Sequence, residues 1–172
     1  MLFIILMIVF ALLAYIPQFF LGDRRDLRMA MRHGMAGAFL FTGTDHFLHD
    51  LDRYVPMMPD FLSPWGLELI WFTGAAEIAG AIGLILPLSL YARFGLPDLR
   101  IWAGICIAVM LCFLVIANIN VAMQGASYAG VGDALPGWYY WVRPALQPLI
   151  ILWALYASGA IRTGQRGQVI AA

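Results

Sequence analysis

Residues 65–87 read WGLELIWFTGAAEIAGAIGLILP, and this stretch decides the class of fold. It starts with an aromatic residue, ends at a proline and is apolar apart from Glu68, Thr73 and Glu77. About 20 mostly apolar residues are enough for an α-helix to cross the hydrocarbon core of a bilayer. The stretch therefore predicts a transmembrane helix with one acidic residue, Glu77, near its middle.

The composition of the 172-residue chain agrees with a membrane protein. Hydrophobic residues make up 63% of the chain and charged residues 12%, whereas soluble domains average about 45–50% apolar and about 25% charged. This composition excludes a soluble domain, and it excludes a disordered chain because disorder requires low hydrophobicity. The ten positively charged residues are all arginines, balanced by ten acidic residues, so no basic face is available for nucleic acid. We expect an all-α integral membrane protein in contact with the lipid bilayer.

Four further apolar segments accompany the quoted stretch. The five predicted spans are Met1–Leu21, Met29–His49, Trp65–Pro87, Leu99–Gln124 and Trp138–Ile161. Their apolar runs are continuous rather than alternating, which favours helices over a β-barrel. The first segment has no basic leading region and no small-residue cleavage site after it, so we expect an uncleaved anchor helix. The predicted organisation is an anchor at 1–21, a four-helix domain at 29–161 and a cytoplasmic tail at 162–172.

The arginines predict the orientation of these spans. Eight would lie on one side of the membrane: Arg24, Arg25, Arg28, Arg32, Arg93, Arg100, Arg162 and Arg166. Arg53 and Arg143 would lie on the other side. Because arginine-rich loops stay in the cytoplasm, we expect the N-terminus outside and the C-terminus inside. The proline-containing segment Val55–Pro64 cannot form a regular helix and would lie along the outer surface as a short lid.

Glu77 is the most informative polar residue, because charge at the bilayer centre costs at least about 2.5–3.5 kcal/mol on insertion scales. Thr73, Gly74 and Ala81 lie within about 60° of it on a helical wheel. Small residues on that face let neighbouring helices approach closely, so we expect Glu77 to point into the bundle. It is either a protonated acid bonded to another helix or a proton carrier or ligand contact, and an intramembrane acid favours the second interpretation.

A second polar stripe lies at the outer end of the segment Met29–His49 and consists of Thr42, Asp45, His46 and His49. Asp45 can orient His49, four residues later on the same helix face. These residues could hold a metal ion together with Glu77, but the H-x-x-H spacing has no H-E-x-x-H motif and no cysteine partner. No metal site is therefore predicted, and His46 and His49 are the only candidate ligands. A hydrated interfacial position is the simpler interpretation for His49, while both interpretations stay open for His46.

Two amides and an arginine complete the set: Asn118 near the end of the fourth segment, and Arg143 and Gln147 on one face of the fifth. Each amide alone would be interpreted as a contact between helices, often worth about 0.6 kcal/mol. In the predicted topology all three lie in the outer half of the membrane, at the depth of His46 and just above Glu77. We therefore predict one polar pocket with apolar walls under the lid, in which Arg143 is the one cation able to neutralise the glutamate.

These residues also carry a family resemblance. The motifs are GTDHF at 43–47, the loop at 55–64, TGAAEIAG at 73–80, NI at 118–119 with Met123, and RPALQP at 143–148 followed by LWA at 152–154. In this order, over residues 33–160, the chain resembles the DoxX family of small bacterial membrane proteins. The resemblance implies a four-helix bundle, to which residues 1–21 would add a further helix. Asn120 stands where relatives often carry an aromatic residue.

The resemblance implies membrane redox chemistry, because some DoxX relatives are subunits of thiosulfate:quinone oxidoreductase and others are linked to thiol and oxidative-stress pathways. We expect an inner-membrane subunit of a quinone-linked oxidoreductase, paired with a redox subunit or a second copy of itself. His46 and Gln147 would hydrogen-bond the carbonyls of a membrane quinone, and Glu77 would deliver protons. Three further residues would contribute to ligand binding: Asp45, Thr73 and Asn118. Arg143 would hold an anionic donor or the charge of the semiquinone.

A non-enzymatic function stays open beside this one. The chain carries no haem-attachment motif or iron–sulfur ligand pattern, so electrons would have to come from a substrate or a partner protein. In the alternative, the chain is a membrane assembly factor or chaperone whose polar pocket is structural or binds a lipid. The substitution Glu77→Gln separates the two, because it should remove activity without unfolding the bundle only in the first case.

Overall fold

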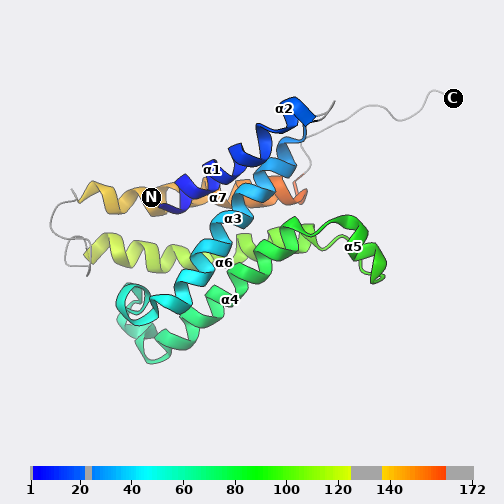
Figure 1. The fold of residues 1–172 in the computed structure, drawn as a ribbon. Helices are drawn as coiled ribbons and strands as arrows, with labels where there is room; N and C mark the ends of the chain where they lie inside the picture. The colour runs from blue at the N-terminus through cyan, green and yellow to red at the C-terminus, as the bar shows by residue number, and fades with distance from the viewer. Residues whose placement is uncertain (1, 22–24, 125–136, 162–172) are drawn as a thin grey trace, which may run out of the picture.

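The computed structural model describes residues 2–21, 25–124 and 137–161, and all regular elements within these ranges are helices (Figure 1). The longer helices are α1 (Leu2–Tyr15), α3 (Leu27–Leu48), α4 (Gly66–Ile85), α6 (Arg100–Gln124) and α7 (Trp138–Ser158). Shorter ones are α2 (Gln18–Leu21), α5 (Leu88–Arg93), the π-helix η1 (Asp50–Tyr54) and the 3₁₀-helices η2 (Val55–Met57) and η3 (Asp60–Trp65). The all-α prediction is confirmed for this part of the chain, while the predicted tail at 162–172 lies outside it.

Four of the five predicted segments correspond to α3, α4, α6 and α7 within a few residues. The first segment does not form one uninterrupted α-helix, because Pro17 separates α1 from α2. Proline lacks a backbone N–H and clashes with the preceding turn; Gln18 Nε2 donates instead to the Ala14 carbonyl at 2.9 Å. Helix α5 was not predicted at all. One side-chain bond joins it to α4, because the Tyr91 hydroxyl donates to the Gly83 carbonyl at 2.8 Å.

Three helical stretches are long and apolar enough to cross a membrane: Leu2–Phe20, Asp60–Ile85 and Arg100–Gln124. Helices α3 and α7 do not reach the same measure of hydropathy and length. Length and composition therefore support three of the five predicted spans. Large apolar side chains such as Leu13, Phe72 and Phe113 are exposed on the outer faces of these stretches, as suits helices that face lipid.

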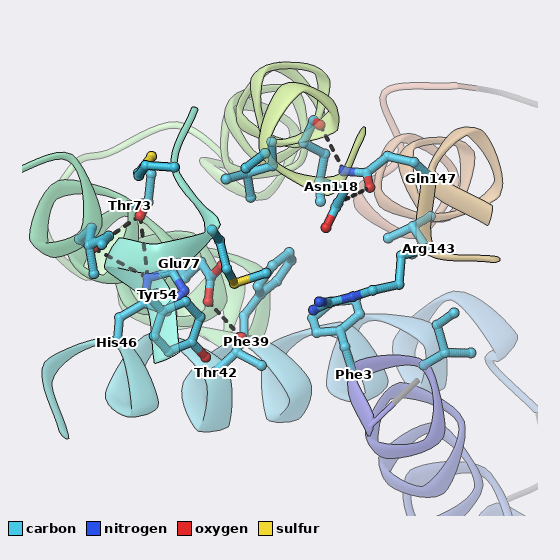
Figure 2. Close-up of a pocket in the computed structure, with 18 residues that line it drawn as sticks. Phe3, Phe39, Thr42, His46, Tyr54, Thr73, Glu77, Asn118, Arg143 and Gln147 are labelled. Atoms are coloured by element: carbon cyan, nitrogen blue, oxygen red, sulfur yellow. Dashed lines mark hydrogen bonds between the residues drawn. The ribbon is translucent and has the colours of Figure 1, made fainter. Parts of the chain in front are cut away.

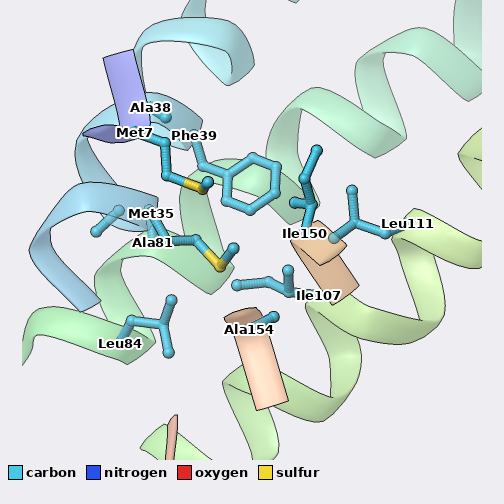
Figure 3. Close-up of a cluster of buried hydrophobic side chains, with 11 residues drawn as sticks. Met7, Met35, Ala38, Phe39, Ala81, Leu84, Ile107, Leu111, Ile150 and Ala154 are labelled. Carbon is cyan, nitrogen blue, oxygen red and sulfur yellow. The ribbon is translucent and has the colours of Figure 1, made fainter. Parts of the chain in front are cut away.

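Four of the long helices pack in a ring, and the fifth, α1, packs against α3. Contacts join α3 to α4, α4 to α6, α6 to α7 and α7 back to α3, and α1 packs on the outside of α3. A buried apolar cluster in the middle takes side chains from all five (Figure 3). Its largest members are Met7 of α1, Met35 and Phe39 of α3, Leu84 of α4, Ile107 and Leu111 of α6 and Ile150 of α7.

Helices α3 and α4 cross at two glycines. A β-carbon on Gly43 would lie 2.8 Å from the Gly74 carbonyl oxygen, and one on Gly74 would lie 2.8 Å from His46 Cβ and 3.0 Å from the Gly43 carbonyl oxygen. Only glycine permits so close an approach. The crossing places His46 of α3 beside Gly74 and Glu77 of α4 beside Gly43, so the two side chains lie on either side of the crossing point.

Among the described residues, five of the seven arginines belong to segments at the end of the bundle where α2, α5 and the end of α7 lie (Figure 1). They are Arg25, Arg28, Arg32, Arg93 and Arg100. Three of them donate to carbonyls at the ends of helices: Arg28 to Ile161 at 3.2 Å, Arg32 to Ala157 at 3.3 Å and Arg100 to Leu86 at 2.9 Å. Such bonds satisfy carbonyl groups that have no partner within their own helix. Helices η1, η2 and η3 lie at the opposite end (Figure 1).

We expect Gly74→Ala to destabilise the bundle, because its methyl group would need space that His46 and the Gly43 backbone already fill. Overpacking of this kind costs about 1–3 kcal/mol. The midpoint temperature of thermal unfolding in detergent, followed by tryptophan fluorescence, measures the effect. Gly66→Ala in the same helix is the matched control, since its nearest neighbouring atoms are 3.9 Å away. A Gly74→Ala protein that melts with the wild type would contradict the tight crossing.

Candidate functional site

A cavity of about 140 Å³ lies inside the ring of helices, at the end where η1 and η2 lie (Figure 2). Its polar lining is formed by Thr42, His46, Tyr54, Thr73, Glu77, Asn118, Arg143 and Gln147. Its apolar lining comes from α1, α3, α4, α6 and α7 and from Met57 and Met58 beside them. The structure thus brings six of the seven predicted site residues to one cavity, and Asp45 lies outside it.

Glu77 is only 4% exposed and is bonded to α3. Its Oε2 lies 2.6 Å from Thr42 Oγ1, which also lies 3.2 Å from the Ala38 carbonyl oxygen. This pair accommodates both protonation states of Glu77. When Glu77 is ionised, or protonated on Oε1, the Thr42 hydroxyl donates to Oε2. When Glu77 is protonated on Oε2, the acid donates to Thr42 Oγ1, and the hydroxyl donates to the Ala38 carbonyl.

The predicted neutralisation of Glu77 by Arg143 is not seen. Among the described residues no ion pair joins the two side chains, and the hydroxyl of Thr42 is the partner of Glu77 instead. Within the described part of the chain, Glu77 Oε1 has no hydrogen-bonding partner, and neither has the guanidinium of Arg143. Both residues line the cavity, so these groups are available to a bound molecule.

His46 is held from two sides. Its Nδ1 lies 3.3 Å from the Ile70 carbonyl oxygen and 3.3 Å from Thr73 Oγ1. The Thr73 hydroxyl donates to the same carbonyl at 3.0 Å. We assign the proton to Nδ1 because a carbonyl oxygen can only accept. This leaves Nε2 with a lone pair and no partner among the described residues. The ring of Tyr54 packs edge-on against the imidazole, with centroids 4.0 Å apart.

On the other side of the cavity the two amides bond to each other. Asn118 Nδ2 donates to Gln147 Oε1 at 2.6 Å, and Gln147 Nε2 donates to the Leu111 carbonyl at 2.8 Å. The amide of Gln147 is therefore already engaged at both of its ends. Its effect in this structure is to orient Asn118, whose Oδ1 has no partner among the described residues.

The Asp45 carboxylate binds to η1, which comes just before the lid, and does not line the cavity. Its carboxylate accepts hydrogen bonds from His49 Nδ1 at 2.8 Å, from the Tyr54 hydroxyl at 2.8 Å and from Arg53 Nη1. The predicted contact with His49 is thus present, while Arg53 and Tyr54 are additional partners from η1. Burial, and then the bond to Asp45, raise the pKa of the Tyr54 phenol, which therefore stays protonated and donates.

His49 does not line the cavity with His46. Within the described ranges, no three histidine, cysteine, aspartate or glutamate side chains lie close enough together to hold a metal ion.

The predicted lid, Val55–Pro64, lies against the cavity through Met57 and Met58. Asn120 Nδ2 of α6 donates to the Met57 carbonyl at 3.1 Å. Trp71 Nε1 of α4 donates to Asp50 Oδ2 at 2.9 Å, and this bond lowers the pKa of Asp50. These bonds tie the residues between α3 and α4 to two different helices.

Several lining residues were not predicted from the sequence. Thr42 belongs to the polar stripe that includes Asp45 and His46, so its position on the wheel was a usable signal. Tyr54 and Met57 lie beside or within the proline-containing segment. Phe3 and Ile4 of α1 also line the cavity, and nothing in their apolar segment distinguishes them from their neighbours.

Comparison with known proteins yields one family. The model of the family described as Domain of unknown function (DUF8561) matches residues 35–158, which is most of the chain. No curated protein and no solved structure matches the chain. The matched range includes every predicted site residue and excludes α1.

We expect Asp45→Asn to loosen the residues that follow α3. Hydrogen bonds to a charged group contribute about 1.5–3 kcal/mol, and about 1.4 kcal/mol corresponds to a factor of ten. The amides of residues 50–58 should therefore exchange with deuterium roughly tenfold faster or more. Asp52→Asn is the matched control, because Asp52 lies within η1 itself and its side chain is exposed. Unchanged exchange in Asp45→Asn would show that this carboxylate does not hold the lid.

Proposed function

The chain belongs to the DUF8561 family, and we propose that it is a membrane protein that binds the headgroup of a membrane quinone in the cavity at Glu77 and His46. In this proposal it acts as a subunit of a quinone-linked oxidoreductase. One observation carries the proposal: side chains from four helices present unpartnered polar atoms to a single small cavity with apolar walls.

The residues fit such a ligand. A quinone headgroup is a flat apolar ring with hydrogen-bond acceptors at its edge. Phe39, Ile70 and Leu111 offer apolar surface to the faces of the ring. Glu77 and Arg143 offer donors, the first as a carboxylic acid and the second as a permanent cation. A few placed polar groups in a largely apolar pocket are typical of small-molecule sites.

When bound, a quinone accepts two electrons and two protons and becomes a quinol. Glu77 can give one proton from Oε1, because Thr42 accommodates the carboxyl group both before and after the transfer. His46, when protonated, can give the second from Nε2 while Nδ1 stays on the Ile70 carbonyl. We assign the electrons to a reduced small molecule or a redox partner protein. The DoxX resemblance makes thiosulfate and thiols the first donors to screen.

We also propose that α3 and α7 cross the membrane, which gives five spans with the N-terminus outside and the C-terminus in the bacterial cytoplasm. Helix α3 has 22 residues and α7 has 21, and at about 1.5 Å per residue each exceeds 30 Å. Both pack within the same bundle as the three apolar stretches. Their polar residues His46, Arg143 and Gln147 line the cavity, which suits helices whose polar faces are turned away from lipid.

Labelling of single cysteines tests this orientation. We expect Ser63→Cys in η3 to react with an impermeant maleimide added to whole cells, and Ser89→Cys in α5 to react only after permeabilisation. Both positions are exposed. Cys106 and Cys112 are free and exposed, so both are replaced by serine in the background. The opposite pattern would invert the topology, and equal labelling would contradict a membrane crossing by α4.

We expect Glu77→Gln to lower quinone binding about tenfold or more, since an acid that donates to the ligand and changes protonation becomes a neutral amide. The measurement is solvent extraction of purified protein with mass spectrometry for prenyl quinones, together with titration of a short-chain quinone. Glu68→Gln is the matched control, because Glu68 is an exposed glutamate in the same helix. Size-exclusion chromatography verifies that both variants fold.

Wild-type protein that neither retains nor binds quinone would contradict the proposal. It would favour the assembly factor or lipid-binding protein, for which the next experiment is identification of partners. A Glu77→Gln protein that fails to fold would indicate a structural acid, and then His46→Asn, with exposed His33→Asn as its control, measures the contribution of the cavity to binding.

A further inference from the structure

Six of the eight polar side chains that line the cavity form two sets on opposite sides of it (Figure 2). The first set comes from α3 and α4 and consists of His46, Thr73 and Glu77; the second comes from α6 and α7 and consists of Asn118, Arg143 and Gln147. No ion pair or hydrogen bond between described residues joins the two sets. Phe39 and the other apolar lining residues lie among them.

The unused hydrogen-bonding capacity on each side specifies what a ligand must carry. In the first set, Glu77 Oε1 and His46 Nε2 are unpartnered, and each can donate when protonated. In the second set, the guanidinium of Arg143 offers only donors, while Asn118 Oδ1 offers one acceptor. Figure 2 shows the Arg143 side chain extending from α7 toward the cavity. A ligand that bonds to Glu77 on one side and to Arg143 on the other carries a hydrogen-bond-accepting oxygen at each of two opposite edges of an apolar body.

The volume limits the size of that body. The cavity measures about 140 Å³, close to the roughly 150 Å³ engineered cavity that holds one benzene molecule. Pockets for drug-sized ligands are larger, at about 300–1,000 Å³. Phe39 and Ile70 are almost completely buried, so the walls cannot retreat without disturbing the core. The cavity is half-open, and the space inside it has the size of one six-membered ring.

We infer that the cavity selects a single-ring 1,4-quinone, a benzoquinone headgroup, over a fused two-ring naphthoquinone. One ring oxygen lies at the Glu77 and His46 side and the other at Arg143. This inference rests on the proposed function and specifies its ligand, since quinone binding alone does not require either ring size.

The test compares a benzoquinone and a naphthoquinone that carry the same short alkyl chain. Each is titrated into the purified full-length chain in detergent and followed by isothermal calorimetry. We expect the benzoquinone to bind at least tenfold more tightly. Equal binding, or tighter binding of the naphthoquinone, would overturn the inference while the proposed function stands. Binding of neither compound would overturn the proposed function itself.

Two variants test the volume and the two-sided contact separately. Leu114→Ala shortens a lining side chain of α6 and should bring the ratio of the two dissociation constants toward one. Ile116→Ala, an exposed position of the same helix outside the lining, should leave it unchanged. Arg143→Gln should weaken benzoquinone binding about tenfold, unlike the control Arg93→Gln at an exposed position of α5. Wild-type affinity in Arg143→Gln would overturn the assigned contact with the second oxygen. This test does not depend on whether Leu114→Ala folds.

Discussion

The close crossing of α3 and α4 is the contact on which the rest of the structure depends. A carboxyl group in the middle of an apolar bundle is costly unless another group bonds to it. Gly43 and Gly74 let the two backbones approach so closely that Thr42 reaches Glu77, and the backbone carbonyl of Ile70 reaches His46. A larger side chain at either glycine would separate the helices and leave both polar groups without these partners. The same two residues that make the helices pack therefore also build one side of the cavity.

Helices α6 and α7 are joined by different groups. Asn118 and Gln147 form a bonded chain across to the Leu111 carbonyl of α6. At the other end of this pair, Gly104 of α6 packs directly against Ser158 and the Ala154 carbonyl of α7. The second side of the cavity is thus held by amide bonds and a close contact, which leaves Arg143 as the one described lining side chain that is permanently charged.

The residues that link α3 to α4 are bonded to three of the long helices at one end of the bundle. Asp45 collects three donors, and two of these, Arg53 and Tyr54, come from the π-helix that follows α3. Because Tyr54 also packs on the ring of His46, a change at Asp45 reaches the cavity through one intervening side chain. Asn120 and Trp71 tie the same segment to α6 and α4. Short helices held through side-chain bonds therefore lie beside this end of the cavity.

The sequence by itself determined the properties that depend on local pattern and composition. It predicted the helical class and the positions of α3, α4, α6 and α7, because long apolar runs bounded by prolines and arginines have few other stable forms in a membrane. It also predicted the contact of Asp45 with His49, since residues four apart on a helix are always neighbours. Six of the seven predicted site residues share one cavity, because polar residues at similar depth on different helices turn toward one another.

Only the tertiary structure decided which polar groups bond to each other. Glu77 is paired with Thr42 rather than with Arg143, Asp45 faces the lid rather than the cavity, and Gln147 is engaged by the protein itself. Phe3 and Ile4 joined the wall because α1 packs on α3. Each of these outcomes depends on how far one helix is rotated and shifted against the next. That geometry is set by close packing at a few small residues, and the sequence of a single helix does not contain it.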